Sequence, residues 1–162
     1  MIRKAKFGDI PRIVELLCEA HERSIYADTA TMDTAEAKRL VMQCIQRHGH
    51  KTEGGCVVFV AETQGAVQGF IIGTLTRHYH ICRELAASDL FFYATPDSDP
   101  RAAPRLLDAM IEWAETNPKV IAITQGVTDV IDSECRASAL YERRGFRRSG
   151  LMFERIVPCL VS

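Results

Sequence analysis

Hydrophobic and polar positions in the first third of the chain predict one short strand and two amphipathic helices. Residues 2–7 have the pattern of a strand. Asp9, a good N-cap residue, then precedes apolar side chains at helical spacing, namely Ile10, Ile13, Val14, Leu17 and Ala20. Asp33, with Glu36 three positions later, has the pattern of a capping box. The helix that it opens has the apolar face Leu40, Val41, Cys44 and Ile45.

Three apolar segments in the middle of the chain predict strands. Residues 56–62 and 66–76 are rich in Val, Ile and Phe, and they flank the turn signal Gln64-Gly65. We therefore expect them to form an antiparallel hairpin. Residues 90–94 predict a short aromatic strand, and residues 96–100 form a loop of turn-forming residues.

The last third predicts two helices that alternate with strands. Residues 100–115 form a helix for which Asp99 is the expected N-cap and Pro100 the first residue. Residues 120–127 have the pattern of a buried strand, residues 134–144 of a helix, and residues 146–157 of one or two closing strands. This order favours a single domain over residues 1–162, of the α/β (α+β) class, with a mixed sheet covered by helices on both faces.

Composition narrows the function classes. Of the 162 residues, 47% are hydrophobic and 25% are charged, and 20 basic against 21 acidic side chains give a net charge of −1. This balance disfavours nucleic acid and anionic membrane as partners. No apolar segment has the length of a membrane span or the pattern of a signal peptide, so we expect a cytoplasmic protein. The six cysteines form no Cys-x-x-Cys motif, and we expect reduced thiols and no bound metal.

The strongest motif is the run Ala137-Ser138-Ala139-Leu140-Tyr141-Glu142-Arg143-Arg144-Gly145-Phe146. Taken alone, it describes the end of a helix, with Leu140 and Phe146 in the core and Tyr141 half-buried. From Glu134 onward, however, the segment resembles the pattern Asn-x-x-Ala-x-x-Leu-Tyr-Glu-x-x-Gly-Phe of the GNAT acetyltransferases.

The resemblance extends over nearly the whole chain. The opening Ile2-Arg3-x-Ala5 with Asp9-Ile10-Pro11 looks like the usual start of that family, and residues 60–73 look like its second and third strands. The resemblance implies the acyl-CoA N-acyltransferase fold, with a mostly antiparallel sheet of about six to seven strands and about four helices. It also implies acetyl-CoA as cosubstrate and an amine as acceptor.

Two catalytic residues follow from the resemblance. Tyr141 stands where the family's tyrosine protonates the departing CoA thiolate, and a phenol with a pKa near 10 carries the required proton at neutral pH. Asp89 stands just before the predicted fourth strand, where several members carry a catalytic carboxylate. Its other interpretation is a cap of that strand. Glu84, His78 and His80 remain rivals for the role of general base.

The phosphate-binding loop departs from the family pattern Arg/Gln-x-x-Gly-x-Gly/Ala. This chain has Ser98-Asp99-Pro100-Arg101-Ala102-Ala103, in which only Ala103 fits. Pro100 and Pro104 lack an N–H, although Arg101 offers a guanidinium to a phosphate. The run Arg101-Ala102-Ala103 also resembles the loop of a variant GNAT-like group that is often associated with phage.

Three further residues are expected at the cofactor. By resemblance, Tyr93 and Ala94 lend backbone groups to the pantetheine arm of CoA, between splayed fourth and fifth strands. Glu134 stands at the place of the family's Asn, which often contacts that arm. An ionised carboxylate accepts hydrogen bonds but cannot donate them.

Two functions therefore stay open. The first is transfer of an acetyl group from acetyl-CoA to a primary amine by direct transfer, with Tyr141 and Asp89 as catalytic residues. The alternative is a catalytically degenerate binding or assembly module of this fold, of phage origin, that has lost CoA binding. The acceptor can be a small amine, an aminoglycoside, a peptide N-terminus or a lysine. A homodimer is in keeping with the family, and the oligomeric state stays open.

Overall fold

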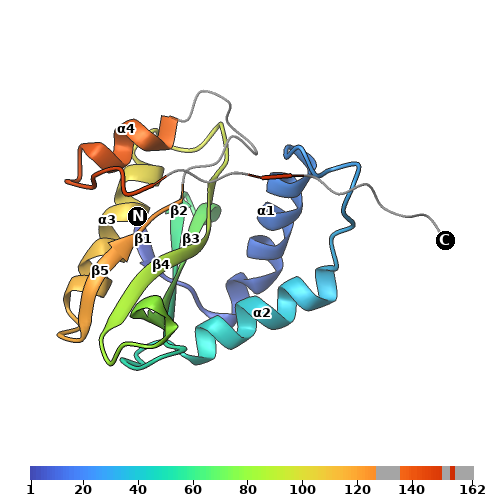
Figure 1. Ribbon diagram of the computed structural model, residues 1–162. Coiled ribbons are helices and arrows are strands. Elements are labelled where there is room, and N and C mark those ends of the chain that lie inside the picture. The colour runs from blue at the N-terminus through green and yellow to red at the C-terminus, as the bar shows by residue number, and fades with distance from the viewer. Residues whose placement is uncertain (127–135, 151–153, 156–162) are drawn as a thin grey trace.

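A sheet of five strands lies between two layers of helices in the computed structural model, which describes residues 1–126, 136–150 and 154–155 (Figure 1). The elements in chain order are β1 (Ile2–Lys4), α1 (Ile10–Glu22), α2 (Thr34–Gln46), β2 (Cys56–Thr63), β3 (Ala66–Arg77), β4 (Leu85–Ala94), α3 (Ala102–Glu115), β5 (Val120–Thr124) and α4 (Arg136–Glu142). Two short 3₁₀ helices, Phe7–Asp9 and His78–His80, precede α1 and β4. Helices α1 and α2 cover one face of the sheet, and α3 and α4 lie on the other (Figure 1).

The sheet has the order β1-β2-β3-β4-β5. The pairs from β1 to β4 are antiparallel and the pair β4–β5 is parallel, so the predicted mixed sheet is confirmed. The described part of the chain contains five strands rather than the expected six to seven. Of the predicted closing strands, residues 146–150 and 154–155 are not in strands, and the rest lies outside the described residues.

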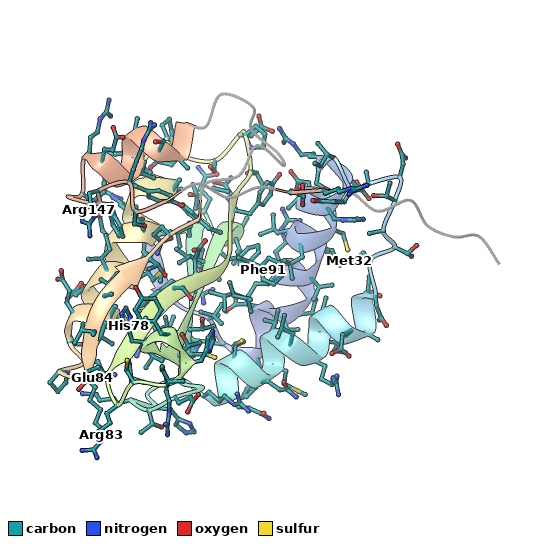
Figure 2. All side chains as sticks on the ribbon, in the orientation of Figure 1. Met32, His78, Arg83, Glu84, Phe91 and Arg147 are labelled. Atoms are coloured by element: carbon teal, nitrogen blue, oxygen red, sulfur yellow. The ribbon has the colours of Figure 1, made fainter. Side chains whose placement is uncertain are left out.

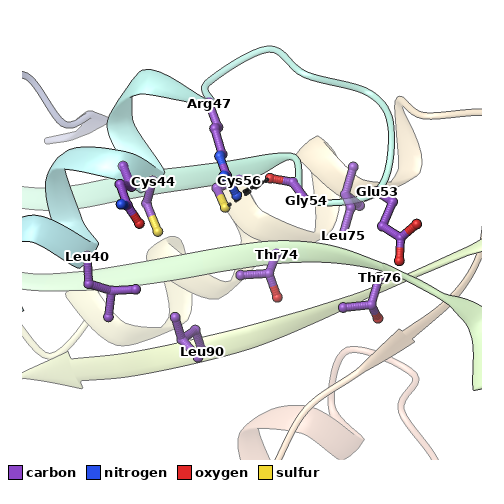
Figure 3. A pocket seen from close by; sticks show the side chains of 11 residues that line it. Leu40, Cys44, Arg47, Glu53, Gly54, Cys56, Thr74, Leu75, Thr76 and Leu90 are labelled. Carbon is purple, nitrogen blue, oxygen red and sulfur yellow. Dashed lines mark hydrogen bonds between the residues drawn. The ribbon is translucent and has the colours of Figure 1, made fainter. Parts of the chain in front are cut away.

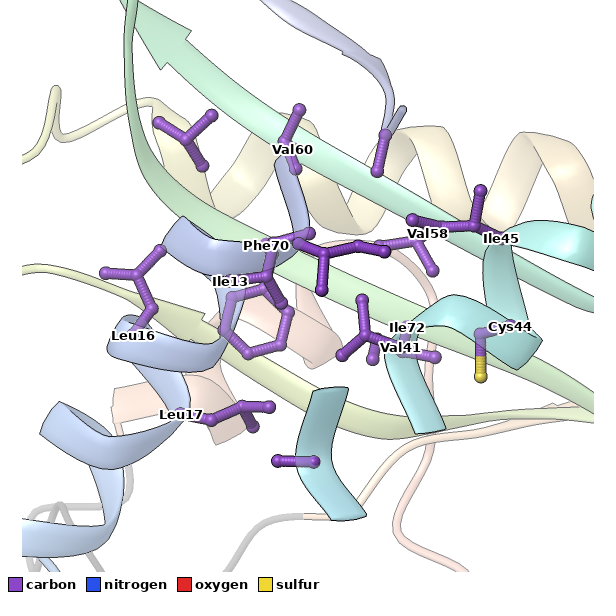
Figure 4. Close-up of a cluster of buried hydrophobic side chains, with 14 of the residues drawn as sticks. Ile13, Leu16, Leu17, Val41, Cys44, Ile45, Val58, Val60, Phe70 and Ile72 are labelled. Carbon is purple, nitrogen blue, oxygen red and sulfur yellow. The ribbon is translucent and has the colours of Figure 1, made fainter. Parts of the chain in front are cut away.

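The larger core lies between the sheet and the helices α1 and α2 (Figure 4). Both predicted helical stripes contribute to it. Fully buried side chains from α1, α2 and the central strands meet there, among them Ile13, Leu16, Val41, Val58, Val60, Phe70 and Ile72. On the opposite face, Leu106 and Met110 of α3 pack on Ile71 of β3. A Cβ at Gly73 would come within 2.9 Å of the Trp113 ring, so only glycine lets β3 approach α3 this closely.

The turn and cap signals are confirmed in two of four places. The predicted N-cap Asp99 and first residue Pro100 are wrong, because α3 begins at Ala102 with Arg101 as its N-cap. The Asp33 carboxylate accepts the Glu36 N–H at 3.0 Å at the start of α2. The Gln64-Gly65 turn has φ values of 52° and 81° and joins β2 to β3. Asp9 does not cap α1 with its side chain. Its carboxylate instead binds the Arg3 guanidinium at 2.7 and 2.8 Å, which ties β1 to the start of α1.

Strand β4 begins five residues earlier than the predicted 90–94, at Leu85. Its first half contains Ala and Ser residues, which have low strand propensity, but neighbours on both sides pair with it. Asp89 therefore lies inside the strand rather than before it. The register passes from Ile72 opposite Phe91 to Gly73 opposite Asp89, so Leu90 is an extra residue in a β-bulge.

Candidate functional site

A gap opens between β4 and β5. Their pairing ends at Ser88 opposite Thr124, where β5 stops, whereas β4 continues through residues 89–94. Thr95 donates its N–H to the Gln68 carbonyl of the β3 side at 2.9 Å. Successive residues of an antiparallel strand direct their N–H and C=O groups alternately toward the partner strand and away from it. Because the Thr95 N–H faces β3, the backbone groups of Phe92 and Ala94 point away from β3 and into the gap. These N–H and C=O groups have no partner among the described residues, and they form one wall of the gap.

The bulge at Leu90 decides which side chains face which helices. Ala87 packs with α3, and so Asp89, two residues later, points to the α3 and α4 side of the sheet. Beyond the bulge, Phe92 packs with α3 instead. Leu90 and Phe91 therefore face the α1 and α2 side, where they are 43% and 39% exposed. Figure 2 shows Phe91 on this side of β4.

Asp89 and Tyr141 meet at the mouth of the gap, on the backbone of Gly126. The Tyr141 hydroxyl donates to the Gly126 carbonyl at 3.4 Å. The Gly126 backbone also lies close enough to the Asp89 carboxyl to lower the pKa of that group. The carboxylate of β4 and the phenol of α4 thus lie beside the same residue, just after the end of β5. The two predicted catalytic residues, 52 positions apart in the sequence, are neighbours in the structure.

Burial determines the protonation of both groups. It raises the pKa of the Asp89 carboxyl above its ordinary value, although the Gly126 backbone partly offsets the shift. Burial also raises the pKa of Tyr141, and the nearby Asp89 charge raises it further. At neutral pH the phenol is therefore a proton donor, and the carboxylate is more basic than an exposed aspartate.

Gln125 places an amide beside the same gap. It follows the last residue of β5, and among the described residues the one hydrogen-bond partner of its Nε2 is the Met110 sulfur, at 3.2 Å. Its Oε1 is buried and has no hydrogen-bond partner among the described residues. Sulfur is a weak acceptor, so in either orientation of the amide a buried polar atom stays unsatisfied. Such an atom fits a site that is completed by a polar ligand.

The N-terminus of α3 has few free amides. The Arg101 N–H donates to the Asp99 carboxylate at 2.8 Å, and the Ala102 N–H donates to the Asp99 carbonyl at 2.7 Å. Pro104 has no N–H. Among the described residues, only the Ala103 N–H in this first turn has no partner. An anion at this helix end would therefore find one amide instead of a ring of them.

Charged side chains partly replace the missing amides. The side chain of Arg101 is 71% exposed and lies 3.3 Å from Asp99, which is itself held ionised because the Arg101 N–H and guanidinium lower its pKa. Arg105 is exposed on the next turn. The residues present fit a phosphate that is bound by guanidinium groups, with Asp99 as a competing anion.

The other predicted site residues are spread more widely. Ala94 lies on the gap, but the backbone groups of Tyr93 face β3, where Tyr93 pairs with Phe70, so they are not available to the pantetheine arm. The Tyr93 hydroxyl donates to the Glu19 carboxylate of α1 at 2.7 Å. Glu134 lies outside the described residues. The rivals of Asp89 precede β4, and Glu84 is five residues from Asp89, about 16 Å along the strand. The described structure does not bring them to the gap.

Sequence reasoning missed three contributors to the gap. Gln125 and Gly126 were read as part of a strand that ends earlier than expected, and Phe92 was read only as an aromatic residue of β4. A glycine directly after a buried strand marks a change of backbone direction. No pattern in the sequence indicates the unsatisfied amide of Gln125.

Within the residues that the structure covers, no helix combines the length and apolar character required for a membrane crossing. In the same part of the chain, no cluster of three or more His, Cys, Asp or Glu side chains has an arrangement suited to a metal ion.

Comparison with known proteins shows the fold. No protein-family model and no curated protein matches the sequence. Among solved structures, a ribosomal-protein-alanine N-acetyltransferase from Brucella melitensis matches with a TM-score of 0.71 and 22% identity, over 93% of this chain and 86% of that chain. An aminoglycoside acetyltransferase from a soil metagenome matches with a TM-score of 0.67 and 12% identity, over 98% and 96%. A transcriptional regulator from Bacillus halodurans matches with a TM-score of 0.72 and 16% identity, over 97% and 99%.

The chain therefore has a GNAT-type fold, as the sequence predicted. The matched proteins carry different functions, so the fold alone fixes neither an acceptor nor an activity. The resemblance to the phage-associated variant stays a prediction.

Proposed function

We propose that this chain is a cytoplasmic N-acetyltransferase that moves an acetyl group from acetyl-CoA directly to a primary amine. The observation that carries the proposal is the convergence of Asp89 and Tyr141 on Gly126, at the mouth of a gap lined by free β4 amides. Direct transfer needs one proton taken from the amine and one given to the leaving thiolate.

Tyr141 and Asp89 are suited to these two roles by their environments. Tyr141 keeps its proton at neutral pH because burial raises its pKa, and so it donates to the sulfur as the thiolate leaves. Burial raises the pKa of Asp89 and makes its carboxylate more basic than an exposed aspartate, and so it is suited to accept the proton of the attacking amine. The carbonyl to be attacked is polarised by backbone N–H groups on the free edge of β4.

The residues along the gap would hold acetyl-CoA, which supplies the activated thioester. The Phe92 and Ala94 backbone groups pair with a pantetheine arm, and the Gln125 amide gives one arm amide a buried partner. Arg101 and Arg105 face the pyrophosphate together with the single free N–H of Ala103. Guanidinium groups at the surface bind phosphate in a salt-dependent manner, so we expect the affinity for CoA to fall as ionic strength rises.

Two measurements test the proposal. A thermal-shift titration with acetyl-CoA should raise the melting temperature, because a ligand of the folded state stabilises it by mass action. Release of CoA is then followed over a panel of primary amines. Tyr141→Phe should lower kcat about 100-fold with little change in stability, since its hydroxyl makes only one long hydrogen bond. Tyr79→Phe, at an exposed tyrosine outside the gap, is the matched control. Unchanged turnover in Tyr141→Phe would remove that residue from the mechanism.

The alternative, a degenerate binding or assembly module, is favoured by the α3 N-terminus, where Asp99 occupies one amide and Pro104 lacks another. It predicts no thermal shift with acetyl-CoA at any ionic strength.

A further inference from the structure

A cavity of about 350 Å³ lies on the α1 and α2 side of the sheet, between the second half of α2 and strands β2, β3 and β4 (Figure 3). Leu40 and Leu90 provide apolar walls, and the buried thiols of Cys44 and Cys56 line it as well. Its polar groups include the Arg47 guanidinium and the Thr76 hydroxyl. The volume is sufficient for a small organic molecule.

The position of Leu90 connects this cavity to the gap. Leu90 is the bulge residue of β4 and follows Asp89 directly. Its side chain lines the cavity, whereas Asp89 faces α4 on the other side of the sheet. The Leu90 end of the cavity is therefore the end nearest to Asp89 along the chain, and the amine of a molecule bound there would have to extend through the gap to reach the Asp89 carboxylate on the Tyr141 side.

The cation that lines the cavity is Arg47, an exposed residue. Among the described residues, no carboxylate lies within 4.0 Å of the Arg47 guanidinium, whose one hydrogen bond is a long contact of 3.5 Å to the Gly54 carbonyl. Glu53 also lines the cavity, but it is paired with Arg77 at 2.9 Å. A guanidinium beside apolar walls is a good partner for a carboxylate.

Strand geometry gives the distance between the Leu90 end and the Arg47 end of the cavity. Leu90 lies opposite the Ile72–Gly73 step of β3, and Gly54, which Arg47 contacts, donates its N–H to Leu75. The Ile72–Gly73 step and Leu75 are two to three residues apart along β3, which corresponds to a distance of about 7–10 Å. The apolar lining between them suits a hydrocarbon stem.

We propose that the cavity binds the acceptor, and that the acceptor is a small amino carboxylate whose amine lies at the Leu90 end and whose carboxylate pairs with Arg47. The substrate class is thus an amine with an apolar stem and a carboxylate about 7–10 Å away. This inference rests on the proposed transferase function for the reaction, but the binding itself does not require catalysis.

Calorimetry without CoA tests the binding. The probe is 6-aminohexanoate, whose extended chain falls in this range of lengths, and hexylamine is the analogue without the carboxylate. We expect 6-aminohexanoate to bind about tenfold more tightly than hexylamine, and Arg47→Gln to abolish that difference. Arg39→Gln is the matched control, because Arg39 lies on α2, the helix that Arg47 follows, is exposed and pairs with Glu36 outside the cavity. In labelled protein, amide shifts at Gly54, Thr76 and Leu90 locate the bound probe.

The outcomes separate this inference from the proposed function. The acceptor-site inference is overturned if the two probes bind equally, or if Arg47→Gln has no effect. It is also overturned if neither probe binds at millimolar concentration, or if the amide shifts fall elsewhere in the protein. Acetylation of amines with no preference for the carboxylate would leave the transferase proposal standing and refute the acceptor class. Arg47-dependent binding in a protein that shows no thermal shift with acetyl-CoA would instead keep the site and refute the transferase proposal.

Discussion

Replacing Gln125 by methionine should stabilise the free protein and weaken its binding of CoA. The free protein leaves the Gln125 Oε1 buried without a partner among the described residues, and the amide's other contact is to a sulfur atom. A buried polar atom in this state costs about 1–3 kcal/mol. Methionine has a similar length and removes that cost.

The expected gain in the free energy of unfolding is about 1–2 kcal/mol, which corresponds to a rise of about 2–8 °C in the melting temperature for a chain of this size. Loss of one hydrogen bond to the pantetheine arm should weaken CoA binding about 5- to 30-fold. Binding of 3′,5′-ADP, which lacks that arm, should be unchanged.

Urea unfolding of the free protein and calorimetry with both ligands measure these quantities. Gln46→Met, at an exposed glutamine that ends α2, is the control and should change neither. If Gln125→Met instead destabilises the free protein and leaves CoA affinity intact, the amide has an internal partner and the reasoning is wrong.

Three further predictions concern charge. Asp89→Asn should lower kcat about 100-fold and remove the acidic limb of the pH profile. It should also stabilise the protein at pH 7, because burial raises the folded pKa of Asp89, and the stability that the wild-type residue supplies at low pH is lost as pH rises through that pKa. Asp99→Asn keeps an acceptor for the Arg101 N–H but removes the competing anion. Calorimetry should therefore show tighter CoA binding at low salt. Weaker binding would contradict the role of Asp99 as a competing anion. The His48 ring accepts the Val58 N–H at 2.9 Å, and burial lowers its pKa from 6.5. The free energy of unfolding should therefore fall as pH drops below 6.5, because the unfolded state then binds a proton more readily. Thermal melts of His48→Gln should show a flatter dependence of the melting temperature on pH.

Local patterns gave most of the framework. The stripe Ile10, Ile13 and Leu17 is buried, Asp33 caps α2, and the Gln64-Gly65 turn joins β2 to β3. Each of these features depends on residues within a few positions of one another, and so a single segment contains the signal.

Features that depend on distant pairing could not be read from one segment. Strand β4 starts at Leu85 because β3 and β5 pair with its first half, although the residues themselves favour no strand. The bulge at Leu90 depends on the register in which β3 pairs with β4. Arg47 and Leu90 line the same cavity because of how α2 packs on the sheet. The meeting of Asp89 and Tyr141 followed from a family resemblance, whereas the Gly126 backbone that joins them had no sequence signal.

The unpaired edge of β4 also bears on how this protein avoids association with other chains. Exposed strand edges recruit further strands and promote aggregation. Among the described residues, the part of this edge without a partner is residues 89–94, because β5 pairs with the first half of the strand. So short an edge offers few backbone groups to a second polypeptide, and a bound ligand would cover them.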